Sequence, residues 1–256
     1  MNEILKQYFD FGVMFDPDNF DKVLKGFWYT VKLSVISGAL SLSWGLVLAV
    51  LRQTRGRFSF VVRWPTIAYI DIFRGIPALL VIVLVSGSLA ALSVENLVTG
   101  DKGPIPKSIG VPDWFSQPAP FWYGVIALTL TYGAYMAEVY RAGIEAVPYG
   151  QMEAACSLGM SHGQAMRKVI VPQAIRKVIP PLLNDFIALT KDTTLVSVIG
   201  LIEVLQAAKD IQAETLNSSA VTLAALMFLL CTIPMARGVD ILIARQQAKF
   251  QRGLAA

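Results

Sequence analysis

The chain has 256 residues, of which 55% are hydrophobic and only 16% are charged. This composition excludes a typical soluble domain, in which about a quarter of the residues carry a charge. The formal net charge of +4 is explained by basic loops beside anionic lipid, so we expect no nucleic-acid partner. The composition therefore predicts an all-α integral membrane protein in contact with lipid, which we treat as a single domain over residues 1–256.

Four uncharged runs are long enough to cross about 30 Å of hydrocarbon as helices, which takes roughly 20 residues. In chain order they are Leu33–Leu51, Gly75–Val94, Ala119–Ala137 and Ser218–Ala236. A fifth apolar run, Val178–Ile202, also contains charged residues. We predict a helical bundle with about five transmembrane helices. The Gly- and Pro-rich stretch at 93–120 predicts an irregular loop.

Lys and Arg are unevenly shared between the connecting loops. They are concentrated in three places: after Leu33–Leu51, between Ala119–Ala137 and Val178–Ile202, and in the C-terminal tail. Short loops rich in these residues stay on the cytoplasmic side of a membrane. We therefore expect the N-terminus outside and the C-terminus inside.

The polar stretch after the third run has the pattern of two short helices. Pro148 suits the start of a helix that continues to Leu158, and Gly159 suits a left-handed helix end. Ser161 and Gln164 have the spacing of a capping box for a second helix. Two helices joined at a glycine would form a rigid knob. From spacing alone, an ordinary helical connection between two spans is an equal alternative.

The run Val178–Ile202 carries polar residues that share one side of a helix. Charged groups in a membrane cost roughly 2.5 to 3.5 kcal/mol each on insertion scales, so they are functional candidates by default. At 100° per residue the polar positions fall within a sector about 120° wide. This polar stripe consists of Asn184, Asp185, Lys191 and Asp192. We expect it to face water, a ligand or a partner chain, and we expect Pro180-Pro181 to interrupt and bend the helix just before it.

Further candidates for a substrate pathway lie on two other segments. Tyr135 and Glu138 share one side of the third predicted helix and offer a surface that could face the polar stripe. Glu138 and Arg141 could instead form an ion pair that reaches the cytoplasmic interface, with Tyr135 a packed ring. Arg74 is a third candidate, although its spacing from Asp71 also suits a simple i,i+3 ion pair.

The sequence offers little for catalysis. It contains no Walker-type glycine loop and a single histidine, His162, and it shows no metal-ligand spacing. We therefore expect no enzyme activity, no metal and no cofactor in this chain. The residues alone leave open a self-contained secondary transporter or channel that uses Asp185 and Asp192 as ion sites.

Three runs, in this order, resemble signatures of one family. Phe73–Pro77 resembles a Phe-Arg-Gly-Thr-Pro signature, and Lys191–Gly200 resembles a Lys-Asp-Thr-Ser-Leu-Val-Ser-Val-Ile-Gly run. Between them, Gln151–Pro172 resembles the EAA loop of bacterial ABC importer permeases. Together they resemble the polar amino-acid permeases of ABC importers, the group that includes histidine, arginine, glutamine and glutamate systems. Ile76 and Thr194 depart from the usual Thr and Ser.

The resemblance implies a type I ABC importer permease fold in the bacterial cytoplasmic (inner) membrane. It also implies a second permease, identical or paralogous, that completes the translocation pathway, and an extracytoplasmic solute-binding protein. ATP and Mg would be held by a dimer of ABC ATPase subunits. The cytoplasmic coupling loop would cover about 142–172, with Glu153 in contact with the ATPase groove. Ala154 and Ala155 would allow close approach, and Gly159 would set the angle of the knob.

Overall fold

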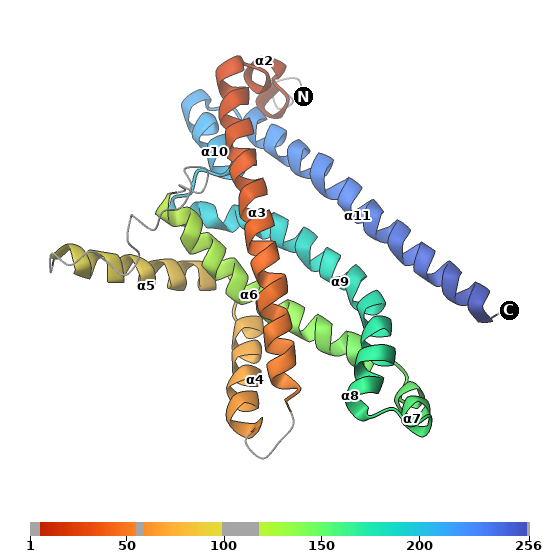
Figure 1. The fold of residues 1–256 in the computed structure, drawn as a ribbon. Helices are drawn as coiled ribbons and strands as arrows, with labels where there is room; N and C mark the ends of the chain where they lie inside the picture. Colours follow the sequence, from red (N-terminus) through yellow and green to blue (C-terminus); the bar gives the residue numbers. More distant parts are fainter. Residues whose placement is uncertain (1–5, 55–58, 99–117, 255–256) are drawn as a thin grey trace, which may run out of the picture.

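The computed structural model describes residues 6–54, 59–98 and 118–254, and these form an all-α bundle (Figure 1). The fold class predicted from composition is thereby confirmed. Most of the predicted loop at 93–120 lies outside the described residues, but the helix before it extends to Val98. The elements in chain order are α2 (Phe11–Met14), α3 (Pro17–Arg52), α4 (Ser59–Gly75), α5 (Ala78–Val98), α6 (Ala119–Glu145), α7 (Tyr149–Ser157), α8 (His162–Ala165), the π-helical η2 (Met166–Ile170), α9 (Val171–Asp192), the 3-10 helix η3 (Thr193–Ile199), α10 (Val204–Thr215) and α11 (Ser219–Leu254).

Helix α3 is much longer than the predicted first span. Its 36 residues extend about 54 Å at 1.5 Å per residue, well beyond the roughly 30 Å of hydrocarbon. Asp16 caps its start by accepting hydrogen bonds from the backbone N–H groups of Asp18 and Asn19. A search for uncharged runs misses this first half because charged residues interrupt it. Its buried residues Val23 and Gly26 instead pack against α10.

The second predicted span belongs to a bent helix pair. Helix α4 ends at Gly75 and α5 begins at Ala78, at an angle of 112° to α4. Pro77 lies at this break and restricts the residue before it to extended backbone, which favours the bend. Within the described parts of the chain, α3 and the first 27 residues of α11 are long and apolar enough to cross a membrane, and α4 with α5 count as a third such element. The remaining candidates of the predicted bundle are α6 and α9, which do not meet the same criterion of length and composition.

Helix α9 corrects two expectations. It continues through Pro180 and Pro181, although we expected an interruption there, and it ends at Asp192 although we expected an apolar span to Ile202. A 3-10 helix follows it and stops at Gly200, whose φ is +87°. Pro180 and Pro181 have no backbone N–H and so remove two hydrogen bonds of the helix. The helix is maintained because α9 packs against both α6 and α11.

Helix α6 lies at the centre of the bundle, in contact with α3, α4, α5, α9 and η3 (Figure 1). Glycines allow the helices to approach closely at these crossings. A Cβ atom at Gly45 of α3 would lie 2.9 Å from the backbone oxygen of Gly133 in α6, and one at Gly133 would lie 2.6 Å from the ring of Trp44. Small residues therefore set the α3–α6 spacing.

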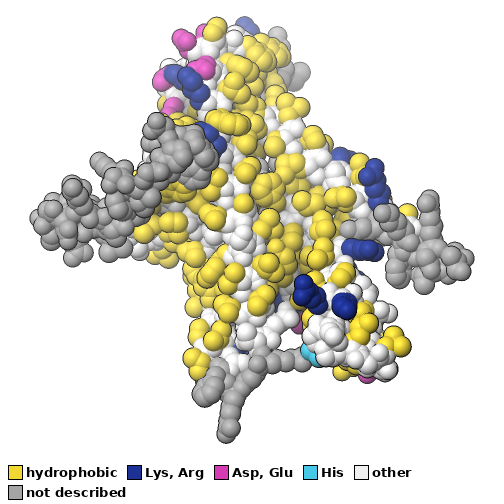
Figure 2. All heavy atoms as spheres, viewed as in Figure 1, with side chains coloured by type: hydrophobic (Ala, Val, Ile, Leu, Met, Phe, Trp, Pro, Cys, Tyr) yellow, Lys and Arg dark blue, Asp and Glu magenta, His cyan; other side chains and the backbone are white. Residues whose placement is uncertain are grey.

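The two ends of the bundle differ. Helices α2 and α10 lie at the end that carries the N-terminus, whereas α7, α8 and the free end of α4 lie at the opposite end (Figure 1). Figure 2 shows hydrophobic side chains over much of the middle of the visible face, with charged side chains mainly toward its ends and margins. This distribution fits a protein whose middle contacts lipid hydrocarbon.

Candidate coupling surface and substrate pathway

The turn between α7 and α8 has the hydrogen bonds of a Schellman motif. The backbone N–H of Gly159 donates to the oxygen of Cys156 at 2.9 Å, and the N–H of Met160 donates to the oxygen of Ala155 at 3.2 Å. Gly159 has a φ of +85°, in the left-handed region that glycine adopts without strain. The glycine stop predicted from the sequence is confirmed.

The second half of the knob begins with the predicted capping box. The Ser161 hydroxyl accepts from the backbone N–H of Gln164 at 3.4 Å, and the Gln164 side chain accepts from the backbone N–H of Ser161 at 3.0 Å. Helix α8 then passes through η2 into α9 without a break in the chain of helical residues. We refer to α7, α8 and the turn between them as the knob.

The knob is attached to both neighbouring membrane helices. Val147 in the turn between α6 and α7, Ile170 of η2 and Ala174 of α9 form a buried apolar cluster, and Met152 of α7 packs against it. The Gln173 side chain donates to that of Gln151 at 3.2 Å, and Lys177 of α9 donates to the backbone oxygen of Ala146 at the end of α6. A force on the knob therefore acts on α6 and α9 together.

The coupling residues suggested by the resemblance lie on different faces of the knob. Glu153, Ala154 and Gly159 are exposed, whereas Ala155 is buried. Two exposed apolar side chains of this region were not among the coupling residues predicted from the sequence. They are Tyr149 and Leu158, which are 76% and 80% exposed. An open hollow of about 560 Å³ lies along α8 and η2 and is lined by Ser161, Gly163, Gln164, Arg167 and Lys168.

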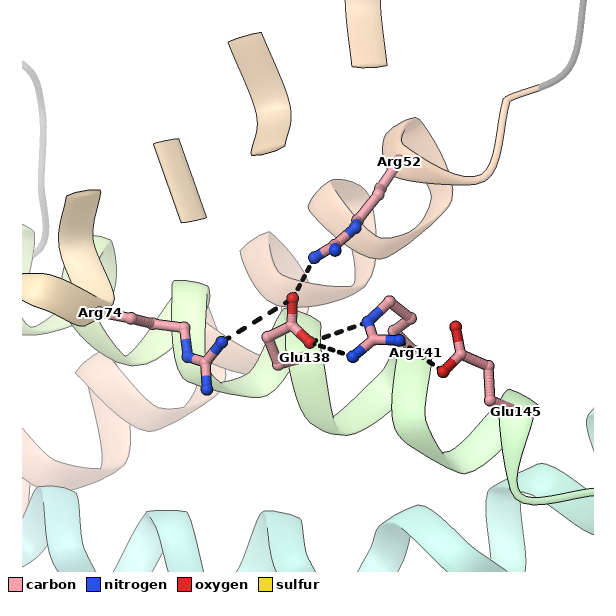
Figure 3. A network of polar contacts seen from close by, with 5 residues as sticks. All are labelled: Arg52, Arg74, Glu138, Arg141 and Glu145. Atoms are coloured by element: carbon pink, nitrogen blue, oxygen red, sulfur yellow. Dashed lines mark hydrogen bonds and ion pairs between the residues drawn. The ribbon is translucent and has the colours of Figure 1, made fainter. Parts of the chain in front are cut away.

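An ionic network joins α3, α4 and α6 near the end of α6 that leads to the knob (Figure 3). The Glu138 carboxylate accepts hydrogen bonds from Arg52 of α3 and, at 2.8 Å, from Nε of Arg141. Arg141 also pairs with Glu145 at 2.5 Å. The Glu138–Arg141 ion pair considered from the sequence is thus confirmed. The contribution of Arg52 was not predicted, because Arg52 lies 86 positions from Glu138 in the chain. The Glu138 side chain is only 13% exposed, so the network clamps α3 to α6.

Arg74, at the end of α4, reaches the margin of this network. Its Nη1 lies 3.9 Å from Oε1 of Glu138, which is beyond hydrogen-bond distance. The i,i+3 ion pair with Asp71 considered from the sequence is not formed, because among the described residues the carboxylate within 4 Å of Arg74 is that of Glu138. The bend after Gly75 directs α5 away from α4, so Arg74 lies at the corner between them (Figure 1).

The four residues of the polar stripe on α9 differ in exposure and in hydrogen bonding. Asn184 and Lys191 are exposed, whereas Asp185 and Asp192 are partly buried. The hydroxyl of Tyr132, a buried residue of α6, donates a 2.8 Å hydrogen bond to Oδ2 of Asp192. The Oδ2 atom of Asp185 is buried and has no hydrogen-bond partner within the described part of the chain.

The structure brings some of the predicted pathway residues together and separates others. The Tyr135 ring packs at 5.5 Å from that of Tyr132, so it lies beside the Asp192 contact. Glu138, by contrast, is engaged by arginines and not by the polar stripe. Tyr132 was missed because an uncharged tyrosine in an apolar run resembles a core residue.

Comparisons with known proteins agree with this architecture. Residues 41–247 match the family of binding-protein-dependent transport system inner membrane components. The chain is 34% identical to the probable glutamine ABC transporter permease protein GlnM of Bacillus subtilis, over 91% of this chain and 97% of that protein. It is also 34% identical to the glutamate transport system permease protein GluC of Corynebacterium glutamicum, over 89% and 95%.

Solved structures show the same fold. A crystal structure of an amino acid ABC transporter with histidines matches with a TM-score of 0.72 and 30% identity, over 88% of this chain and 94% of that chain. An inward-facing structure of the MetNI methionine ABC transporter matches with a TM-score of 0.64 and 19% identity, over 90% and 98%. The second likeness concerns the fold alone.

The helical bundle and its helix–turn–helix knob define a membrane permease of the type I ABC importer fold. The family match covers most of the chain, and the relatives are aligned over nearly their whole length. The chain belongs to the family of binding-protein-dependent transport system inner membrane components. The resemblance drawn from the three sequence runs is thereby confirmed.

Proposed function

We propose that this chain is the permease subunit of an ATP-driven importer of polar amino acids and that it docks an ATPase through the coupling loop at 142–172. The observation that carries the proposal is the rigid knob, which is attached to α6 and α9 at once. Relatives named for glutamine and glutamate transport support the substrate class. ATP and Mg would then be bound by the ATPase subunits and not by this chain.

Coupling would pass from the knob to the pathway through α9. Glu153 and Ala154 are exposed and available to an ATPase groove, while Gly159 fixes the angle between α7 and α8. Because α9 continues from the knob through η2 and ends at the polar stripe, closure of the ATPases would move the stripe as part of a rigid body. A second permease, identical or paralogous, would supply the other wall of the pathway, since rocking requires a second bundle.

The proposed location is the bacterial inner membrane, with the N-terminus outside and the C-terminus inside. The N-terminus and the knob lie at opposite ends of the bundle, which supports this orientation (Figure 1). The native Cys156 is exposed on α7 and provides a test. In intact cells it should resist a membrane-impermeant maleimide, whereas a cysteine at exposed Ala213 near the end of α10 should react. The reverse pattern would reject the orientation.

Reconstitution tests the transport function. The complex of this permease with its ATPase, together with the solute-binding protein, is placed in proteoliposomes and supplied with L-glutamine, L-glutamate or L-arginine. We expect uptake with ATP and none with an ion gradient alone. Uptake driven by a gradient alone would instead establish the alternative, a secondary transporter that uses Asp185 and Asp192.

A further inference from the structure

Exposed aromatic side chains gather on the N-terminal segment, to which the proposed function assigns no role. They are Tyr8, Phe9, Phe11, Phe15 and Phe20, and we call them the aromatic patch. Phe11 and Phe15 are 68% and 59% exposed. The ring of Phe15 lies 6.3 Å from that of Phe11 and 6.1 Å from that of Phe20, in stacked arrangements. Apolar groups gathered on a surface in this way mark a contact with lipid or with another protein.

The aromatic patch is held on a fixed part of the fold. Met14 of α2 is buried in a core cluster with Val23 of α3, Ile211 of α10 and Ala220 of α11. Helix α2 therefore has a packed side at Met14 and an apolar side that remains exposed at Phe11. The exposure of the rings is thus a property of the folded protein and not of a loose chain end.

Hydrogen bonds place the aromatic patch beside the start of a membrane helix. The backbone N–H of Asp10 donates to the Ser219 hydroxyl at 2.8 Å, and the N–H of Ser218 donates to the backbone oxygen of Gln7 at 2.8 Å. Ser219 is the first residue of α11, and Ser219–Arg245 is long and apolar enough to cross a membrane. Helix α2 accordingly lies beside the beginning of α11 (Figure 1). This position corresponds to the headgroup level, where α11 would enter the bilayer.

The apolar surface continues from this level along α11, where the exposed side chains include Leu226, Leu229 and Leu230. The charges around the aromatic patch are of the opposite kind to those that attract anionic lipid. From Lys6 to Lys22 the sequence has four aspartates and two lysines. Electrostatic attraction to anionic headgroups therefore favours no contact here. Burial of the rings is left as the driving force.

We propose that the aromatic patch inserts into the headgroup region of the leaflet at the N-terminal end of the bundle and anchors α2 and the first turn of α3 there. Aromatic rings are favoured at this depth, and an amphipathic segment binds it through its apolar side. The anchor depends on ring burial and not on the charge of the lipid. It is independent of the proposed transport function, so a failure to import amino acids would leave it in place.

The experiment measures the depth of spin labels in the purified permease–ATPase complex in nanodiscs. Cys156 and Cys231 are replaced by Ser, and single labelled cysteines are placed at Phe11 or Phe15. Reference labels replace Leu230, which is 77% exposed on the membrane helix α11, and Ala213, which is exposed near the end of α10. The quantity measured is the ratio of collision rates with oxygen, which concentrates in hydrocarbon, and with a water-soluble nickel chelate.

We expect the ratios at positions 11 and 15 to lie between those at 213 and 230. They should be the same in nanodiscs of phosphatidylcholine and in nanodiscs that also contain phosphatidylglycerol. With the label at position 11, Phe15→Asp should shift the ratio toward that at position 213, because a charged group opposes insertion. Phe15→Leu is the matched control and should leave the ratio unchanged.

Four results would overturn the anchor. Ratios at 11 and 15 equal to that at 213 would place the aromatic patch in water. Insertion only with phosphatidylglycerol would assign the contact to charge. Water-like ratios that fall further toward exclusion of both reagents when the solute-binding protein is added would identify a protein-docking surface. No response at position 11 to Phe15→Asp would mean that the bundle alone holds α2 at this depth.

Discussion

Gly38 of α3 lies directly against the ring of Phe186 of α9, so that a Cβ atom at position 38 would be 2.5 Å from Cε2 of that ring. The contact sets the spacing between α3 and the part of α9 that carries the polar stripe.

Gly38→Ala should lower the free energy of unfolding by about 1–3 kcal/mol, the usual effect of overpacking. Phe186→Leu in the same chain should recover part of this loss, since it removes the atoms that the new methyl group meets. Thermal denaturation of the purified complex measures both. Gly238→Ala is the control, because a Cβ atom there meets nothing within 4 Å. Equal stability of the two alanine variants would contradict the close contact.

Glu138→Gln should destabilise the protein strongly, because it leaves Arg52 and Arg141 without their shared carboxylate. Removing one partner of a largely buried pair has a typical effect on the order of 3 kcal/mol. Glu145→Gln should change stability by at most about 1 kcal/mol, since that side chain is 62% exposed. Denaturation of Glu138→Gln, Arg52→Gln and the double variant should reveal non-additive effects. Additive losses would mean that the two side chains do not act together.

Gly159→Val should uncouple the knob while the protein still inserts in the membrane. A β-branched residue tolerates a φ of +85° poorly, so the turn should change its angle. ATP-driven uptake should be lost, and the ATPase should co-purify poorly or hydrolyse ATP without transport. Gly163→Ala is a suitable control, because it lies four residues away, has open space around it and needs no left-handed backbone. Normal uptake by Gly159→Val would remove the coupling role of the turn.

Glu203→Ala should loosen the start of α10. The Glu203 side chain is fully buried and accepts 2.9 Å hydrogen bonds from the backbone N–H groups of Leu205 and Gln206. Loss of this cap should reduce stability by about 1–2 kcal/mol. Hydrogen exchange of the amides of Leu205 and Gln206 should accelerate. Glu203→Gln should have a smaller effect because its amide oxygen can still accept, and equal exchange in all three proteins would argue against the cap.

The knob could be predicted from the sequence because its geometry depends on neighbours in the chain. The Schellman turn at Gly159 and the capping box of Ser161 and Gln164 close hydrogen bonds over five residues or fewer. The same holds for the Glu138–Arg141 pair, which is one helical turn apart. Local spacing fixes such contacts before the rest of the chain is in place.

The sequence by itself determined the all-α membrane class, the approximate positions of the apolar helices and the family signatures. Only the tertiary structure decided that α3 continues to Pro17, that α9 passes through Pro180 and Pro181, and that α5 turns by 112° from α4. It also decided the Arg52–Glu138 and Tyr132–Asp192 contacts, which join residues 86 and 60 positions apart. The reason is physical: a helix can retain charges, prolines or a bend wherever packing from other helices replaces what its own backbone lacks, and those neighbours come from distant parts of the chain.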